Sequence, residues 1–391
     1  MPLAHPLRRA AARHAAPRTV PGEGLPVMSI TTNAAFARRR PASIPVHLVG
    51  SLPPPLHRDI RAALAWPLVH CGDAPLTAMY YEPDPRWMVD WLDNLARIPA
   101  LEQVRSGASQ GYDDVPYYRI RPGHELDPAD LAMGRIAQTE AVFAVLDTLD
   151  TGAVPRRLQV GIPNAFDRAV FASGSPEAAD EWMPALQASV MDEVAALAAR
   201  WGDRVQLQLE SPAVLAAYHR AAHEDWPLLT AELVQQVSGI IEAAQDARWI
   251  LHLCYGDLEH EPLFTPVDLD AAVQFLNALA DALAERGIPM PTVHLPVAHG
   301  SAPPSTDPAF YRALLRLRRG IHVIAGVVAE DHPVESRHAL VLITDALGGP
   351  VEGIAAGCGL GRRTLAAAAA NMALAARLAH GRSPLSARRT A

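Results

Sequence analysis

The stretch ILHLCYGD at positions 250–257 decides how the rest of this sequence is interpreted. It is an apolar run with two prolines soon after it, which is typical of a buried β-strand that ends in a loop. Because successive side chains of a strand point to opposite faces, His252 and Cys254 point the same way. An imidazole and a thiolate directed at one point are half of a tetrahedral zinc site. Further along the chain, Cys358 in the stretch AAGCGLGRR (355–363) is the comparable cysteine that could add to them.

The composition limits the class of protein. The chain has 391 residues, half of them apolar, which suits one α/β barrel with extensions. The net charge of −8 is spread along the chain, and the absence of a basic stripe with interleaved aromatic residues argues against nucleic acid as a partner. Three cysteines cannot make a disulfide framework, and no apolar run approaches the roughly 20 residues of a membrane span. We therefore expect a cytoplasmic protein with no membrane partner.

The chain contains no lysine, so every basic residue other than histidine is arginine. A lysine amine is required for aldolase chemistry through a Schiff base and for a P-loop. The sequence therefore excludes both classes.

The two ends of the sequence differ from the rest. Residues 1–43 carry seven arginines against the single acid Glu23, together with many alanines and prolines. We expect a disordered extension here, with Met28 as a possible true first residue; the alternative is an organelle transit peptide. Residues 382–391 are expected to form a disordered tail.

From Ile44 onward, short β-branched runs alternate with long helical stretches rich in alanine and leucine, which is the pattern of an α/β barrel. We predict a single (β/α)8 TIM barrel over residues 44–381. The eight candidate strands are 46–51, 68–71, 158–162, 205–210, 249–255, 292–297, 322–328 and 353–358. The candidate helices are 176–200, 225–247, 266–286, 308–317, 333–347 and 363–380.

In such a barrel the active site lies at the C-terminal ends of the strands. His252 and Cys254 would end strand five and Cys358 would end strand eight, so all three reach the same rim. The plain alternative is that the cysteines are core residues and the histidine is a hydrogen-bonded filler. The aromatic loop 111–118 would lie over the barrel mouth, or would pack on its own tyrosines as a surface Ω-loop.

Several motifs together resemble the cobalamin-independent methionine synthase superfamily. HLCY (252–255) with CGLGRR (358–363) resembles the zinc-binding pattern of that family. VGSLP (49–53) is similar to its strand-one motif, LQLESPA (207–213) to its strand-four motif, and His332-Pro333 to its strand-seven turn. The similarity covers residues 44–381 and is closest to a divergent branch of stand-alone barrels.

The resemblance implies an enzyme that methylates a thiol. In the family, zinc binds the thiol homocysteine, and the charge of the metal stabilises its thiolate, which takes a methyl group from a folate. The implied cofactor is Zn²⁺, and the implied partners are a small-molecule thiol and a folate-like methyl donor. The pathway would be cobalamin-independent methionine biosynthesis.

The resemblance also implies a set of metal ligands. His252, Cys254 and Cys358 would bind the zinc ion. The family's fourth ligand is a glutamate on strand six, but the strand here, PTVHLPV (291–297), has no acid. His294 is the best substitute, and a neutral ligand in place of an anion would leave the metal a stronger Lewis acid.

Roles in substrate binding and catalysis follow from the same motifs. Gly50 and Ser51 would hold the carboxylate of the amino acid, and Arg362 could bind a carboxylate as a bidentate fork or could cover the barrel rim. Glu210 would contact the substrate ammonium, unless it is paired with an arginine. His332 would be the general acid near the leaving nitrogen of the folate.

Two of the motifs depart from the family. On strand two the family has a glutamate after His-Gly, where this chain has HCGD (70–73), so Asp73 would take that role or would cap the next segment. At strand seven the spacing between the acid and the histidine differs, and an N-cap by Asp331 ahead of Pro333 is the alternative to a catalytic His332.

Three classes of function remain open from the sequence. The first is a zinc-dependent thiol methyltransferase. The second is another enzyme on the same barrel, either a different alkyl transferase or a metal-free decarboxylase of the uroporphyrinogen type, which has no need of the histidine and cysteine set. The third is a non-catalytic barrel with a closed four-ligand zinc site.

Overall fold

The computed structural model describes residues 43–84 and 86–381. Two segments are predicted to be disordered, residues 1–43 and residues 382–391. Both lie outside this range, except for Ser43. In the described part of the chain, no helix has the length and apolar character needed to cross a membrane.

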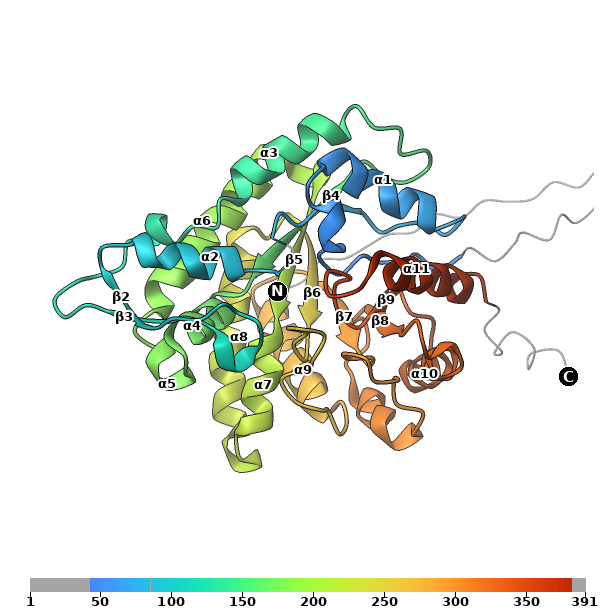
Figure 1. Ribbon diagram of the computed structural model, residues 1–391. Coiled ribbons are helices and arrows are strands. Elements are labelled where there is room, and N and C mark those ends of the chain that lie inside the picture. Colours follow the sequence, from blue (N-terminus) through green and yellow to red (C-terminus); the bar gives the residue numbers. More distant parts are fainter. Residues whose placement is uncertain (1–42, 85, 382–391) are drawn as a thin grey trace, which may run out of the picture. The chain divides into compact units, whose positions relative to one another are not determined.

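A curled sheet of seven parallel strands forms the centre of the fold, with helices around its outer face (Figure 1). The strands follow the order β1-β4-β5-β6-β7-β8-β9. Their bounds are β1 (Met79–Tyr80), β4 (Leu158–Pro163), β5 (Val205–Ser211), β6 (Arg248–Leu253), β7 (Thr292–Pro296), β8 (Val323–Val328) and β9 (Gly353–Ala356). The six strands from β4 to β9 agree with the prediction, because each is an apolar run long enough to cross the core.

The predicted eight-stranded barrel is confirmed only in part. The segment predicted as strand one makes single parallel bridges, from Val46 to Leu76 before β1 and from Val46 to Ile354 in β9. The short segment 45–47 thus provides the backbone contact between the two edges of the sheet. The described residues form a seven-stranded curled sheet with a narrow seam, and a complete eight-stranded barrel is not formed among them.

The predicted strand 68–71 is wrong. Residues up to His70 belong to helix α1 (Ile60–His70), whose N-cap Asp59 accepts hydrogen bonds from the amides of Arg61 and Ala62. A short apolar run fits a helix end as well as a strand, so its pattern could not distinguish the two. The strand at this edge of the sheet is β1, which has only two residues.

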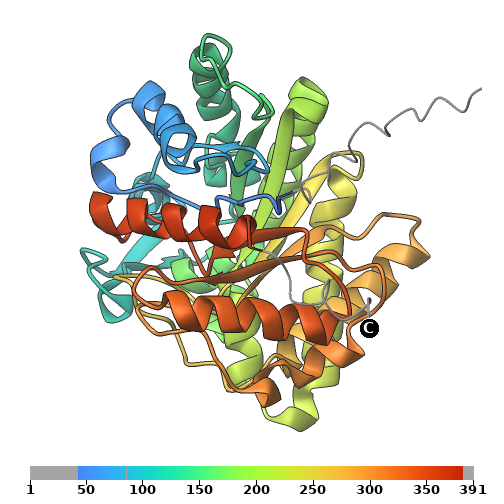
Figure 2. The same cartoon turned by 90° about the vertical axis from the view of Figure 1, so that its right-hand side faces the viewer.

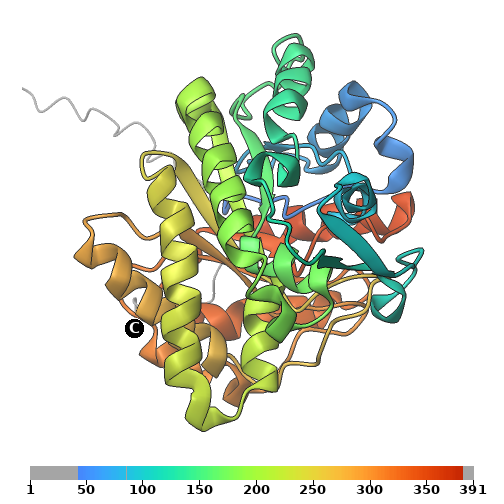
Figure 3. The same cartoon turned by 90° about the vertical axis from the view of Figure 1, so that its left-hand side faces the viewer.

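Eleven α-helices lie within the described residues, and most of them pack outside the sheet. Their bounds are α1 (Ile60–His70), α2 (Val89–Asn94), α3 (Arg135–Leu146), α4 (Ala165–Ser173), α5 (Pro176–Ala179), α6 (Met183–Trp201), α7 (Pro212–Arg220), α8 (Trp226–Ala243), α9 (Asp270–Glu285), α10 (Pro333–Leu347) and α11 (Leu365–Ala379). Figure 2 shows α10 and α11 in front of the last strands, and Figure 3 shows α6 and α8 on the opposite side.

Two predicted helices differ in form. The predicted helix 176–200 is divided into α5 and α6, because Pro184 lies in the first turn of α6, where a missing N–H costs nothing. The predicted helix 308–317 is a 3-10 helix, η7 (Pro308–Arg316). The bounds predicted for α10 are confirmed.

An antiparallel hairpin is inserted in the chain between β1 and β4 (Figures 1 and 3). Its strands are β2 (Leu101–Arg105) and β3 (Tyr117–Ile120), and its connection carries the aromatic loop. The Tyr112 hydroxyl accepts a hydrogen bond from the Leu258 amide at 3.0 Å and donates one to the Glu261 carbonyl at 3.2 Å. The loop is therefore joined to the segment that follows β6, as expected for a cover of the rim.

Candidate metal centre

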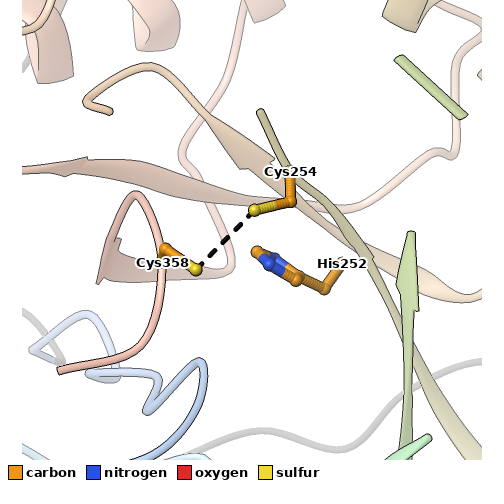
Figure 4. Close-up of side chains that lie close together, drawn as sticks. All are labelled: His252, Cys254 and Cys358. Carbon is orange, nitrogen blue, oxygen red and sulfur yellow. Dashed lines mark hydrogen bonds between the residues drawn. The ribbon is translucent and has the colours of Figure 1, made fainter. Parts of the chain in front are cut away.

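Three side chains from distant parts of the chain meet at the C-terminal rim of the sheet. His252 belongs to β6, Cys254 follows that strand directly, and Cys358 follows β9. One ligand atom from each lies within 4.8 Å of the others, and the two sulfurs are 3.6 Å apart (Figure 4). The three residues that the sequence selected as metal ligands therefore lie together.

The backbone around the two cysteines holds the sulfurs in place. Gly256 has a φ of +85°, and its amide donates a hydrogen bond to the Cys254 sulfur at 3.3 Å. On the opposite side, a Cβ at Gly357 would collide with the carbonyl group of Ala298, so the residue before Cys358 has to be glycine. Each loop thus depends on a glycine, Gly256 for its positive φ and Gly357 for its close approach to the backbone of Ala298.

The charge states of the cluster suit a cation. Burial, helped by the nearby His47, lowers the pKa of His252 to about 3, so its imidazole is neutral, as a metal ligand must be. The hydrogen bond with Cys358, together with burial, raises the pKa of Cys254 well above its ordinary value. A positive charge beside two sulfurs 3.6 Å apart would balance the charge of thiolate ligands. The donor set therefore fits a divalent metal that accepts nitrogen and sulfur.

The predicted fourth ligand, His294, does not belong to the cluster of ligand atoms. Its Nε2 lies 2.9 Å from the carbonyl oxygen of Ala356, and its Nδ1 lies 2.7 Å from Nδ1 of His252. Both ring nitrogens are therefore engaged in hydrogen bonds. His294 thus contacts the candidate ligand His252, and its role as a fourth metal ligand stays a prediction.

These hydrogen bonds assign the protons of both rings. A carbonyl oxygen only accepts, so Nε2 of His294 carries its hydrogen, and burial keeps that ring neutral by lowering its pKa well below the ordinary value. Nδ1 of His294 must then accept, and Nδ1 of His252 must donate. The lone pair of His252 consequently lies on Nε2, where a metal could take it.

The cluster opens into a cavity of about 100 Å³ at the rim. Four residues that the sequence assigned to substrate binding or catalysis line the same cavity, namely Gly50, Ser51, Glu210 and Arg362. The Gly50 loop lies against the loop that follows Cys358, since a Cβ at Gly50 would be 3.2 Å from Cα of Gly359. The first and last segments of the sheet therefore build one wall together.

Within the described residues, the hydrogen bonds of Glu210 come from Gln208 and Trp87 and from no arginine. Its Oε1 accepts from Gln208 at 2.9 Å and its Oε2 accepts from the indole of Trp87 at 2.6 Å. Burial, and then the nearby charge of Glu82, raise the pKa of Glu210 to about 7. The carboxyl group is therefore poised between its two charge states at neutral pH.

Sequence reasoning missed Glu82, a second buried carboxylate of the cavity. It lies two residues after the end of β1 and accepts a hydrogen bond from Arg135 at 2.7 Å, and burial raises its pKa. An acid between the apolar run Ala78–Tyr80 and Pro83 was a usable signal. The wrong placement of strand two directed attention to Asp73 instead.

Asp73 and His332 are described by the structure but do not line this cavity. Asp73 is exposed in the turn after α1. His332 is the N-cap residue of α10 without a capping side-chain bond, and its Nε2 lies 3.2 Å from the Ser301 carbonyl oxygen. The alternative of an N-cap by Asp331 is not found either.

Comparison with known proteins identifies the fold. A B12-independent methionine synthase from Shewanella sp. W3-18-1, in complex with selenomethionine, matches with a TM-score of 0.53 and 12% identity over 87% of this chain and 97% of that chain. The two proteins share one fold. The family resemblance of the motifs is thus confirmed at the level of the fold, and an identity this low shows nothing more.

A methyltransferase from Methanosarcina mazei also matches, with a TM-score of 0.49 and 12% identity over 86% of this chain and 93% of that one. No protein-family model and no curated protein matches the sequence.

Proposed function

We propose that this protein is a zinc-dependent S-methyltransferase that methylates a small thiol, either homocysteine or a related compound. The observation that carries the proposal is the convergence of His252, Cys254 and Cys358 within 4.8 Å at the edge of the rim cavity. The donor set of one imidazole and two cysteine sulfurs suits zinc. When bound, zinc would supply positive charge that keeps the substrate sulfur ionised at neutral pH.

The reaction joins the thiol sulfur to a methyl group taken from nitrogen. The new bond between sulfur and carbon forms as the bond between the methyl carbon and the donor nitrogen breaks, and that nitrogen gains a proton. The thiol proton is lost when the sulfur ionises. We infer a methyl-folate as the donor, from the motif resemblance and the shared fold, which would make the reaction independent of cobalamin.

The cavity residues have separate tasks in this proposal. The loop of Gly50 and Ser51, with Arg362, offers hydrogen-bond donors for a substrate carboxylate. Asp73 and His332 have no part in it, since neither lines the cavity. We place the protein in the cytoplasm, where free cysteines such as Cys254 and Cys358 stay reduced.

The other two classes of function receive less support. A metal-free decarboxylase has no use for the clustered histidine and cysteines. A purely structural zinc site is closed by four protein ligands, whereas the cluster in the described chain has three. Three ligands leave a position for substrate, which supports an enzyme.

Metal analysis tests the proposal directly. The protein purified without chelator should hold about one zinc ion per chain, and Cys254→Ser and Cys358→Ser should each lose it. Cys71→Ser is the matched control, because Cys71 is also buried but lies outside the cluster. Absence of zinc from the unmodified protein would refute the proposal.

X-ray absorption at the zinc edge tests the role of the thiol. Titration with a thiol substrate should add a sulfur neighbour to the metal. A spectrum that no thiol changes would refute thiol activation even if zinc is present.

A further inference from the structure

The indole of Trp87 lies against the carboxylate of Glu210. The motif resemblance implies that this carboxylate binds the ammonium group of the substrate. The indole Nε1 donates to Oε2 of Glu210 at 2.6 Å, while Gln208 donates to Oε1 at 2.9 Å. Both oxygens of this buried carboxylate therefore have a donor from the protein itself. An ammonium group that approached Oε2 would have to compete with the indole N–H of Trp87.

Trp87 is held in this position by its surroundings. Its backbone φ is +76°, a conformation that a bulky residue keeps only where the structure around it imposes it. Asp84 organises the turn: its carbonyl accepts from the Trp87 amide at 3.1 Å, and its carboxylate accepts from the amides of Arg86 and Asp90 at 2.7 and 2.8 Å. The ring of Phe171 also lies edge-on to the indole, with 5.8 Å between the ring centroids.

The second carboxylate of the cavity is supplied with donors in the same way. Oε1 of Glu82 accepts from Arg135 at 2.7 Å, and Oε2 accepts from the Tyr80 hydroxyl at 3.3 Å. Arg135 and Glu82 form a buried ion pair, so the charge of Glu82 is balanced within the protein. Glu82 therefore requires no cation from the substrate, and the carboxyl group of Glu210 is held by two neutral donors.

The wall beside the two acids is apolar. It is formed by Trp87, Met88, Val89, Leu92, Val115 and Phe171, all of which line the cavity. A charged ammonium group would lose its hydration against this surface. A hydrocarbon group would gain contact there.

We propose that the thiol substrate lacks the α-ammonium group of an amino acid, and that Trp87 is the residue that determines this specificity. The proposal rests on the proposed function, because it concerns the substrate of the same site. The substrate class is a small apolar thiol, with or without a carboxylate for the loop of Gly50 and Ser51. Trp87 selects this class of substrate in two ways: its N–H is hydrogen-bonded to Glu210, and its ring forms part of the apolar wall that the substrate contacts.

Two thiols that differ only in the ammonium group test the proposal. Homocysteine and its desamino analogue, 4-mercaptobutyrate, are titrated into the zinc-loaded full-length protein, and binding is measured by calorimetry. We expect 4-mercaptobutyrate to bind at least about tenfold more tightly, because homocysteine must desolvate its ammonium against the apolar wall and share Glu210 with the Trp87 indole. Tighter binding of homocysteine would overturn the specificity and leave the proposed function standing.

A variant assigns the effect to the indole N–H. Trp87→Phe keeps an aromatic ring and removes the donor, so the preference should shift toward homocysteine by about tenfold. Trp91→Phe is the matched control: Trp91 also donates through its indole, at 2.9 Å to the Leu131 carbonyl, but does not line the cavity. An unchanged ratio in Trp87→Phe would overturn the proposal.

The remaining outcomes are also decisive. If neither thiol binds the zinc-loaded protein, this inference is overturned, and the metal analysis and the zinc-edge titration decide the proposed function. If Trp87→Phe does not fold, the comparison of the two thiols in the unmodified protein still decides the specificity.

Discussion

His294 lies against the candidate metal ligand His252 without joining the cluster of ligand atoms. The family that the motifs resemble has an acidic ligand on this strand, and the neutral histidine here bonds to His252 and to the Ala356 carbonyl instead. This chain of hydrogen bonds fixes the ring orientation of His252 and leaves Nε2 available. A site with three protein ligands then carries one negative charge fewer than a site with the acid.

Replacing His294 by phenylalanine should weaken metal binding without changing the set of ligands. The ring volume is kept, but Nδ1 of His252 loses its partner, so zinc affinity should fall about 10- to 100-fold. The zinc-edge spectrum should still show one imidazole and two protein sulfurs. His299→Phe is the control, because His299 is a half-buried histidine outside the cluster and should not alter affinity.

The same spectrum can contradict this account. If His294→Phe removes an imidazole from the metal, then His294 is a ligand, as the sequence alone suggested.

At the scale of elements, the sequence predicted what local patterns determine. The alternation within β6 was sufficient to bring His252 and Cys254 to one side, and the run before Cys358 was sufficient to place it at the same rim. The strand β1 has only two residues, too short for any periodicity, so its position and Glu82 were missed. The contact of Trp87 with Glu210 joins residues 123 positions apart and left no local signal.

The loop after β6 is a second element whose conformation the site depends on. Gly256 has a φ of +85°, and a Cβ there would collide with the Tyr112 hydroxyl and approach the Leu263 amide nitrogen to 3.1 Å. The glycine therefore permits both the turn that holds Cys254 and the contact with the hairpin loop.

Gly256→Ala should consequently cost more stability than a positive φ alone explains. Gly123→Ala is the matched control, since Gly123 has a φ of +78° and no atom within 4 Å of the added Cβ. The control should lose about 1–2 kcal/mol in urea unfolding, which is the cost of the left-handed conformation. Gly256→Ala should lose clearly more and should also bind less zinc. Equal losses in the two variants would show that the contact with Tyr112 does not matter.

At the scale of the whole molecule, the metal centre connects the middle of the sheet with its seam. Cys254 follows β6, and Cys358 belongs to the loop that packs on Gly50. The seam itself is short: the Val46 amide donates to the Pro75 carbonyl at 2.8 Å, and the His47 amide donates to the Ile354 carbonyl at 2.8 Å. By comparison, β4 and β5 pair along six residues.

Hydrogen exchange should therefore show the seam as the part of the sheet that opens most easily. The amides of Val46 and His47 should exchange faster than those of β5, because few contacts resist local opening there. Zinc should slow exchange at the seam more than in β5, since a metal bound to Cys358 restrains the loop that covers Gly50. In Cys358→Ser this effect of zinc should vanish. Equal protection of β5 and the seam by zinc would mean that the metal stabilises the whole fold uniformly, and the seam would then open only when the entire sheet unfolds.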